Sequence, residues 1–235
     1  MSAFGTTPDT TTVAATAERA YLREVFAWMA LGLALTTGVA VWLHNAGDVL
    51  RYFDDHPSAL WVLIGAQFLM VIVLSFGLSR MSGSVAATLF CVYAGLIGVT
   101  FAILLGVYTD ASVITAFAGA GGVFAGMAAL GYTTKIDLSR FRGILFGALI
   151  GIVVASIAYM FVGGQTLNLI IGWGGVIVFS ALTAYDMQKI KQIGAQGFAN
   201  EDDQQKAAIF GALALYLDFV NLVISLLRIF GSARR

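Results

Sequence analysis

Seven long apolar stretches, separated by short polar connections, dominate this sequence. A helix needs about 20 apolar residues to cross the roughly 30 Å hydrocarbon core of a bilayer. Stretches of about this length are 25–43, 59–79, 84–107, 112–132, 143–162, 166–186 and 209–230. No connection between them is long enough to form a second domain. The sequence therefore predicts an all-α polytopic membrane protein with seven transmembrane helices.

The composition excludes several other classes of protein. Charged residues make up 11% of the 235 residues and hydrophobic residues 59%, whereas soluble domains carry about 25% charged residues. Thirteen Lys and Arg balance thirteen Asp and Glu, so no basic excess is available to bind nucleic acid. A single cysteine, Cys91, allows neither an intrachain disulfide nor a cysteine-based metal site. A soluble enzyme, a disordered chain and a nucleic-acid-binding protein are excluded, and the expected environment is the lipid bilayer.

The termini and the basic residues predict the domain limits and the orientation. Residues 1–24 are polar and Thr-rich and contain no apolar signal core, so we expect a short flexible cytoplasmic tail. The membrane domain then covers 25–231, and 232–235 form a short C-terminal tail. Nine Lys and Arg gather on one side of the first six spans, against only Arg51 on the other. This bias predicts a cytoplasmic N-terminus.

The last stretch leaves two topologies open. If it crosses the membrane, Arg228, Arg234 and Arg235 lie outside, against the positive-inside bias. If it only re-enters, they stay inside. Its length favours a full crossing.

Most ionisable residues lie in the tail or the loops, and no lysine lies in a predicted span. The ionisable groups that remain as candidates for chemistry are Arg80, Asp186 and Asp218. Asp218 is the deepest, within LALYLDFVNLVISLL. An aspartate at a helix centre costs roughly 2.5–3.5 kcal/mol on insertion scales. Intramembrane carboxylates usually face the interior of a bundle and mark ion or proton pathways. We therefore expect the last helix to lie inside the bundle.

The connectivity predicts that the two aspartates approach each other. The sixth and seventh stretches are consecutive and antiparallel, and Arg80 ends the second span on the same side. Asp218 lies deeper than Asp186, so contact requires the sixth helix to run deeper or the seventh to start later. Two carboxylates close together share a proton and offer oxygen ligands to Ca²⁺. Asn221, one turn beyond Asp218, extends this candidate ion path. A buried Arg–Asp pair that only fixes helix packing is the open alternative.

Two C-terminal motifs carry a family resemblance. TAYDMQKIK at 183–191 and ALYLDFVNLVISLLRIFG at 214–231 resemble the Bax inhibitor-1 family, the transmembrane Bax-inhibitor-motif proteins. Leu22–Val25 and Gly32–Thr36 are also similar to the family's first span. The resemblance extends from about residue 20 to the end, and the short loops and tail resemble bacterial members.

The resemblance implies a fold and an activity. It implies seven helices with the C-terminal helix central and ringed by the other six, and a pH-sensitive calcium leak. It implies that Asp186 and Asp218 form a hydrogen-bonded pair that senses pH, and that Arg80 holds this pair in one state. The sequence departs from some relatives at the second span, which carries Gln67 and no carboxylate.

The leading hypothesis is a pH-sensitive cation leak channel in a bacterial plasma membrane. It is not an enzyme and needs no cofactor. Protons and Ca²⁺ are its expected partners, with Ca²⁺ as the transported ion and Asp186 and Asp218 as candidate low-affinity Ca²⁺ ligands. The alternatives are a non-catalytic regulator that binds a membrane protease or another membrane protein, a proton-coupled transporter, and an intramembrane aspartyl protease. The protease is disfavoured because Asp218 lies in LYLD rather than GxGD.

Small residues at GxxxG spacing let helices approach closely in lipid. The sequence has this spacing at Gly122/Gly126 and at Gly147/Gly151. We expect both pairs to lie at helix–helix contacts.

Overall fold

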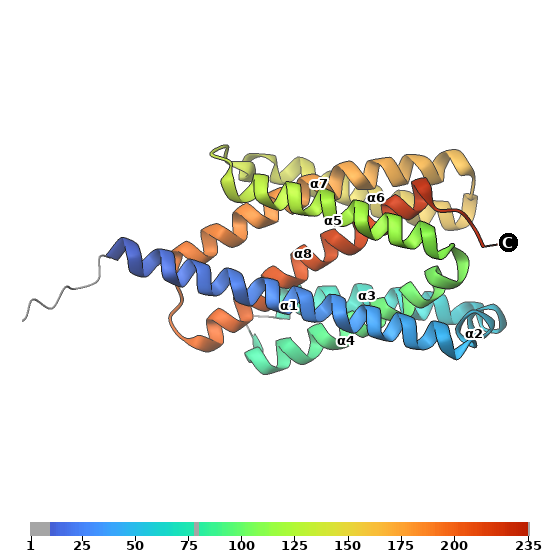
Figure 1. The fold of residues 1–235 in the computed structure, drawn as a ribbon, viewed down its shortest axis with the longest axis horizontal. Helices are drawn as coiled ribbons and strands as arrows, with labels where there is room; N and C mark the ends of the chain where they lie inside the picture. Colours follow the sequence, from blue (N-terminus) through green and yellow to red (C-terminus); the bar gives the residue numbers. More distant parts are fainter. Residues whose placement is uncertain (1–9, 78–79, 235) are drawn as a thin grey trace, which may run out of the picture.

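The computed structural model describes residues 10–77 and 80–234, and it is helical almost throughout (Figure 1). The helices are α1 (Thr10–Ala46), α2 (Val49–Asp55), α3 (Pro57–Gly77), α4 (Gly83–Val107), α5 (Asp110–Thr133), the 3-10 helix η2 (Leu138–Phe141), α6 (Arg142–Val162), α7 (Gln165–Gln196) and α8 (Glu201–Phe230). Within these residues, seven helices are long and apolar enough to cross a membrane. The expected all-α fold with seven spans is therefore confirmed.

The polar N-terminal segment is helical over much of its length, which corrects the expected tail at 1–24. Helix α1 begins at Thr10, and residues 1–9 lie outside the described part. Tyr21 is fully buried: its ring contacts Phe198 with centroids 4.9 Å apart, and its hydroxyl donates to the Ala207 carbonyl at 3.2 Å. Hydropathy detects only the part of a helix that matches the bilayer. The helix continues beyond that part because Tyr21 packs against the segment that joins α7 and α8.

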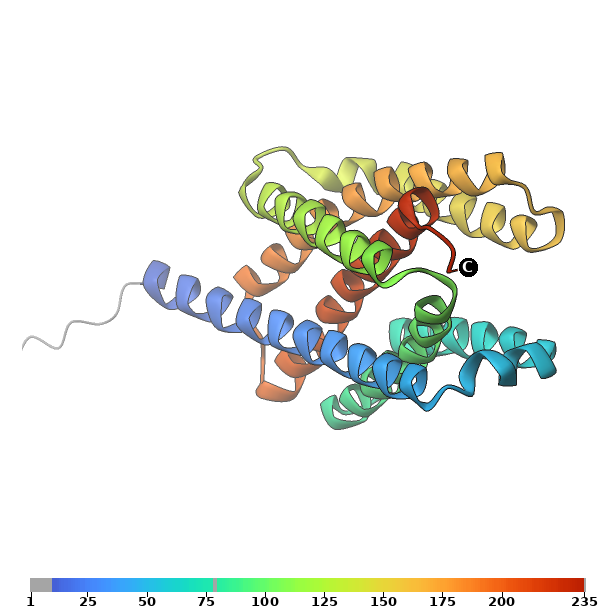
Figure 2. The same ribbon diagram turned by 45° about the vertical axis from the view of Figure 1, so that its right-hand side comes forward.

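The spans form two groups of three with α8 between them (Figures 1 and 2). In the first group α1 and α3 both pack against α4, and in the second α5 and α6 both pack against α7. The chain direction is reversed between the groups, because α5 starts at the end of the bundle that α4 reaches. Helix α8 packs against α1, α4, α5 and α7 and is the most buried span. Helices α3 and α6 are the two outermost members.

Close helix packing occurs at glycines other than the predicted pairs. A Cβ at Gly98 would lie 2.7 Å from the Cβ of Val39, so this glycine allows α4 to approach α1. A Cβ at Gly131 would meet the backbone of Ala184, so this glycine allows α5 to approach α7. The GxxxG pairs face open space: a Cβ at any of their four glycines meets nothing within 4 Å. The expectation that these pairs pack within the chain is wrong.

The C-terminal segment is held on the connection between α4 and α5. Thr109 donates its backbone N–H to the Ser232 carbonyl at 3.0 Å, and Arg234 donates its backbone N–H to the Val107 carbonyl at 2.8 Å. The Arg234 guanidinium also pairs with Asp110 at 2.6 Å. Helix α8 thus runs through the bundle and ends opposite its start, as expected for a full crossing. Arg235 lies outside the described residues.

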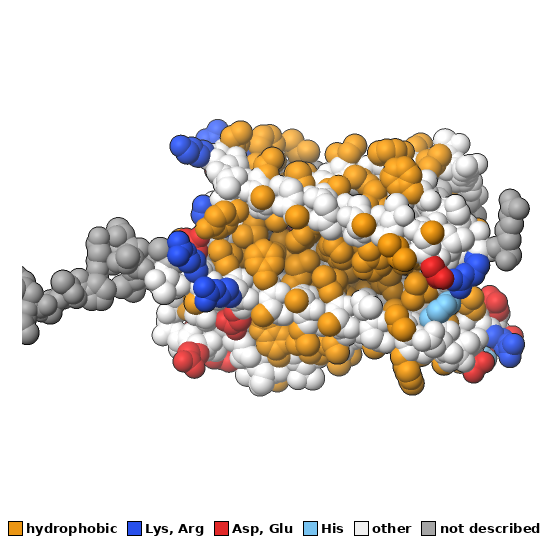
Figure 3. Space-filling view, viewed as in Figure 1, with side chains coloured by type: hydrophobic (Ala, Val, Ile, Leu, Met, Phe, Trp, Pro, Cys, Tyr) orange, Lys and Arg blue, Asp and Glu red, His pale blue; other side chains and the backbone are white. Residues whose placement is uncertain are grey.

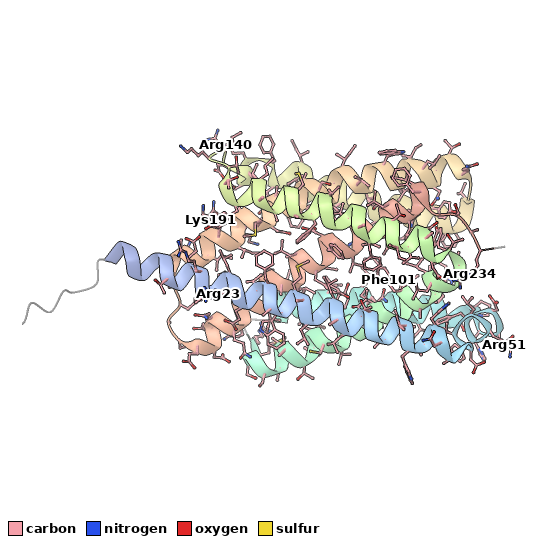
Figure 4. The ribbon with its side chains drawn as sticks, in the orientation of Figure 1. Arg23, Arg51, Phe101, Arg140, Lys191 and Arg234 are labelled. Carbon is pink, nitrogen blue, oxygen red and sulfur yellow. The ribbon has the colours of Figure 1, made fainter. Side chains whose placement is uncertain are left out.

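Charged side chains gather at the two ends of the bundle, with a mostly apolar surface between them (Figure 3). Figure 4 shows Arg23, Arg140 and Lys191 at one end, which we call the basic end. Arg51 and Arg234 lie at the other, which we call the C-terminal end. Large apolar side chains are exposed along the outer helices, as a surface in contact with lipid requires.

Candidate functional site

A cavity of about 390 Å³ lies between the two outermost helices, α3 and α6. Side chains of α4, α7 and α8 complete its lining. Seven of the lining side chains carry amide, hydroxyl or charged groups other than phenols: Gln67, Ser75, Thr100, Asp186, Lys189, Asp218 and Asn221. The remainder of the lining is apolar or aromatic. The cavity therefore places ionisable groups inside an otherwise apolar bundle.

Asp218 is the more deeply buried of the two carboxyl groups that line the cavity. Only 4% of the residue is exposed, and Oδ2 has no hydrogen-bond partner among the described residues. Thr183 of α7 interacts with this carboxyl, while its own Oγ1 donates to the Phe179 carbonyl at 2.7 Å. A buried carboxylate oxygen without a donor is costly, so the site is suited to a proton or a cation.

Asp186 lines the same cavity and interacts electrostatically with Asp218. It is half-buried on α7. This helix continues past the predicted end of the sixth span to Gln196, so Asp186 lies within a helix and not at its end. The two aspartates share one cavity although α8 begins at Glu201, earlier than the predicted start of the seventh span at 209.

Lys189 also lines the cavity, contrary to the expectation that every lysine lies outside the spans. Its ammonium interacts with Asp186 and lies 5.4 Å from the centre of the Phe210 ring. The sequence holds a signal for this residue. Positions 186 and 189 are three apart, so they share one face of a continuous helix. The predicted sixth span stops at Asp186, whereas α7 continues to Gln196, and Lys189 lies on this continuation.

Two amide side chains extend the polar lining. Asn221 lies one turn beyond Asp218 on α8, as predicted, and its Nδ2 donates to the Leu217 carbonyl at 2.8 Å. Gln67 of α3 donates from Nε2 to the Leu96 carbonyl at 2.9 Å and to Thr100 Oγ1 at 2.7 Å. Gln67, the amide that the second span carries in place of any carboxylate, thus also lines the cavity.

Arg80 lies elsewhere in this conformation. It is exposed between α3 and α4, and it does not line the cavity. The cation beside the aspartates is Lys189 instead. The role of Arg80 in holding the pair stays a prediction.

The grouping of the acidic residues bears on whether the site could hold a metal ion. No group of three or more His, Cys, Asp or Glu side chains within the described part of the chain is placed to hold a metal ion. Ca²⁺ takes six to eight oxygen ligands. Asp186 and Asp218 alone supply fewer oxygen ligands than this, so their role as Ca²⁺ ligands stays a prediction.

The comparisons with known proteins identify the family. A sequence profile described as inhibitor of apoptosis-promoting Bax1 matches residues 18–235. The chain belongs to the Bax inhibitor-1 family. The resemblance of the two C-terminal motifs is thereby confirmed, and the matched region begins within α1 and includes every residue of the cavity.

Bacterial proteins match along most of the chain. The inner membrane protein YbhL of Escherichia coli K12 is 43% identical over 215 residues, which are 91% of this chain and 92% of YbhL. A protein of Deinococcus radiodurans is 42% identical over 217 residues, 92% of this chain and 91% of its own length. A protein of Borreliella burgdorferi is 33% identical over 214 residues, 91% of this chain and 92% of its own length. This chain is accordingly a multi-pass integral membrane protein of the bacterial type.

Proposed function

We propose that this Bax inhibitor-1 family member is a pH-sensitive leak channel for cations, with Ca²⁺ as the transported ion. The observation that carries the proposal is the shared cavity of Asp186 and Asp218, in which one carboxylate oxygen has no donor among the residues that the structure describes. Ionisable residues inside a membrane bundle mark ion and proton paths. No enzymatic role is proposed.

The aspartates act as the gate in this proposal. Interacting carboxylates titrate as a pair. While the pair holds a proton, α7 and α8 stay packed together, and α8 closes the path toward the C-terminal end with the buried side chains of Leu222, Val223 and Leu227. When the proton leaves, the two negative charges repel each other. The helices then separate, and the carboxylates become ligands for an entering cation.

The basic end faces the cytoplasm in this proposal. Arg23, Arg140 and Lys191 lie there together, and cytoplasmic segments of membrane proteins carry an excess of Lys and Arg. The N-terminus is then cytoplasmic, and the C-terminal end faces the periplasm of a bacterial inner membrane. The inner-membrane assignment of the relative YbhL supports this location.

Calcium flux into liposomes tests the proposal. The purified protein is reconstituted around a Ca²⁺ indicator, and uptake is followed from about pH 6 to 8. Asp186→Asn, Asp218→Asn and the double variant are compared with Asp54→Asn, which changes an exposed acid on α2. We expect uptake to rise with pH in the unchanged protein and the control, and the cavity variants to lose this dependence. Uptake equal to that of empty liposomes at every pH would reject the channel.

Proton-coupled transport is a second candidate, favoured by the two groups of three helices with opposite directions. Transporters often consist of inverted repeats with the binding site between them. A pH indicator inside the liposomes separates the two functions. A transporter moves protons in fixed ratio to Ca²⁺, whereas a leak passes Ca²⁺ without this ratio.

A third candidate is a non-catalytic regulator that binds a membrane partner. If this is the function, the aspartate variants should keep their effect on that partner.

A further inference from the structure

The cavity between α3 and α6 is lined largely by apolar and aromatic side chains, which a small inorganic ion does not require. Phe68 and Val71 of α3 face it from one side, and Phe146, Leu149 and Val153 of α6 from the other. A volume of about 390 Å³ falls within the range of pockets that hold small organic molecules, roughly 300–1,000 Å³. The walls favour a ligand with an apolar body.

The carboxylates that line the cavity favour a positively charged hydrogen-bond donor on the same ligand. Asp186 and Asp218 bring two carboxylates, against the single ammonium of Lys189. That ammonium acts on Asp186 and lies over the Phe210 ring, while Oδ2 of Asp218 has no donor among the described residues. An anion would be repelled here, and an apolar molecule without a donor would leave this oxygen unpaired.

The position of the cavity indicates where a ligand enters. Helices α3 and α6 are the outermost members of the two groups, packed on α4 and α7 respectively. Near the C-terminal end they meet through the rings of Trp61 and Phe161, whose centroids are 5.8 Å apart. On the side of this contact that faces the basic end, the cavity lies between two lipid-facing helices. The acyl chains of the membrane are therefore its nearest surroundings.

We propose that this cavity binds a lipophilic ammonium ion, with its apolar body between α3 and α6 and its N–H donated to Asp218. Such a ligand satisfies the unpaired oxygen through a charge-assisted hydrogen bond. It would occupy the same carboxylates as an entering cation, and it would block the leak. The binding itself does not depend on ion conduction, so it is tested without an ion gradient.

Titration calorimetry with 1-aminoadamantane and its neutral analogue 1-adamantanol tests the proposal. The protein is held in phosphatidylcholine nanodiscs at pH 7.5, and empty nanodiscs correct for partition into lipid. We expect saturable binding of the amine and none of the alcohol. Asp218→Asn should weaken binding of the amine by about tenfold or more, as the loss of a hydrogen bond to a charged group does. Asp54→Asn should leave it unchanged.

A second variant separates loss of the ligand site from misfolding. Val153→Trp fills the cavity from α6 and keeps both aspartates. It should lose binding of the amine while retaining the helical circular dichroism and the melting temperature of the unchanged protein. The proposal is rejected if no saturable binding is seen, if the alcohol binds as tightly as the amine, or if the folded Asp218→Asn variant binds normally. Failure of calcium flux with intact amine binding would reject the channel alone.

The amine could also come from a lipid headgroup. Repeating the titration in nanodiscs that contain phosphatidylethanolamine distinguishes the two sources. Weaker binding of 1-aminoadamantane in these nanodiscs assigns the site to the lipid amine, and unchanged binding assigns it to a free lipophilic amine.

Discussion

The hydroxyl of Tyr216 lies 2.5 Å from Oγ1 of Thr36, which itself donates to the Ala94 carbonyl at 2.9 Å. Because Thr36 uses its proton for Ala94, Tyr216 is the donor to Thr36. These two bonds join α8 to α1 and α4 in the buried centre of the bundle. Tyr216 and Asp218 are two residues apart and therefore point to different faces of α8. The hydroxyl contact thus fixes the rotation of α8 that directs Asp218 into the cavity.

Removal of this contact should destabilise the protein in a graded way. Tyr216→Phe deletes one donor and should cost about 0.5–1.5 kcal/mol. Thr36→Val leaves the buried Tyr216 hydroxyl without its acceptor and should cost more, about 1–3 kcal/mol. Thr37→Val is the matched control, since Thr37 is exposed and its hydroxyl donates to the Leu33 carbonyl of its own helix. Unfolding titrations with denaturant measure all three. Equal loss for Thr36→Val and Thr37→Val would contradict the assigned role.

Gly131 allows α5 to approach α7 two residues before Asp186. A Cβ at this position would meet the carbonyl and the Cα of Ala184. Gly131→Ala should therefore destabilise the protein by about 1–3 kcal/mol, as overpacking does. Gly126→Ala on the same helix meets nothing within 4 Å, so it should be neutral or stabilising by up to about 1 kcal/mol. Melting temperatures compare the two, and equal effects would show that the backbone contact is unimportant.

Lys189 should set the pH at which the leak opens. Its positive charge lies beside Asp186 and favours the ionised carboxylate. Lys189→Met removes that charge, so the midpoint of calcium uptake should move to higher pH. Lys191→Met is the control, because Lys191 contacts the Tyr132 carbonyl and ring on α5 rather than the cavity. A midpoint that moves equally in both variants, or not at all, argues against Lys189 as part of the gate.

Asp137 provides a pH-dependent contact outside the membrane spans. The hydroxyl and the backbone N–H of Ser139 hold the pKa of Asp137 below its ordinary value, and the N–H donates to Oδ1 at 3.0 Å. Since the folded-state pKa is depressed, this contact stabilises η2 at pH values above about 4, and the contribution is lost as the pH falls through the folded-state pKa. Carboxyl carbon NMR should show Asp137 titrating at lower pH than an aspartate in a short peptide. Titration at the peptide value would show that the contact is absent in solution.

The chemistry of single residues made part of the site predictable. The cost of burying Asp218 predicts that α8 lies inside the bundle, and the antiparallel order of the last two spans predicts that Asp186 and Asp218 share a site. Helix ends are less predictable, because packing extends a helix beyond the stretch that its hydropathy marks. Tyr21 and Lys189 both lie on such continuations and were therefore assigned wrongly.

The direction in which a helix face points could not be read from the sequence. The GxxxG pairs have the right spacing for close packing, yet their glycines face open space. Gly98 and Gly131 belong to no such pair and make the close contacts instead. Which face meets a neighbour depends on the arrangement of all seven spans, and this arrangement is a property of the whole fold.

The two groups of three helices repeat one packing pattern in opposite directions. A scaffold of this kind, taken alone, would present nearly the same architecture to both sides of a membrane. Helix α8 belongs to neither group, so no second helix repeats it in the opposite direction. It carries Asp218, and its end bears the segment fastened to the C-terminal end of the bundle. The polarity of the molecule, which decides the side from which a proton first reaches the carboxylates, therefore resides in a single unduplicated helix.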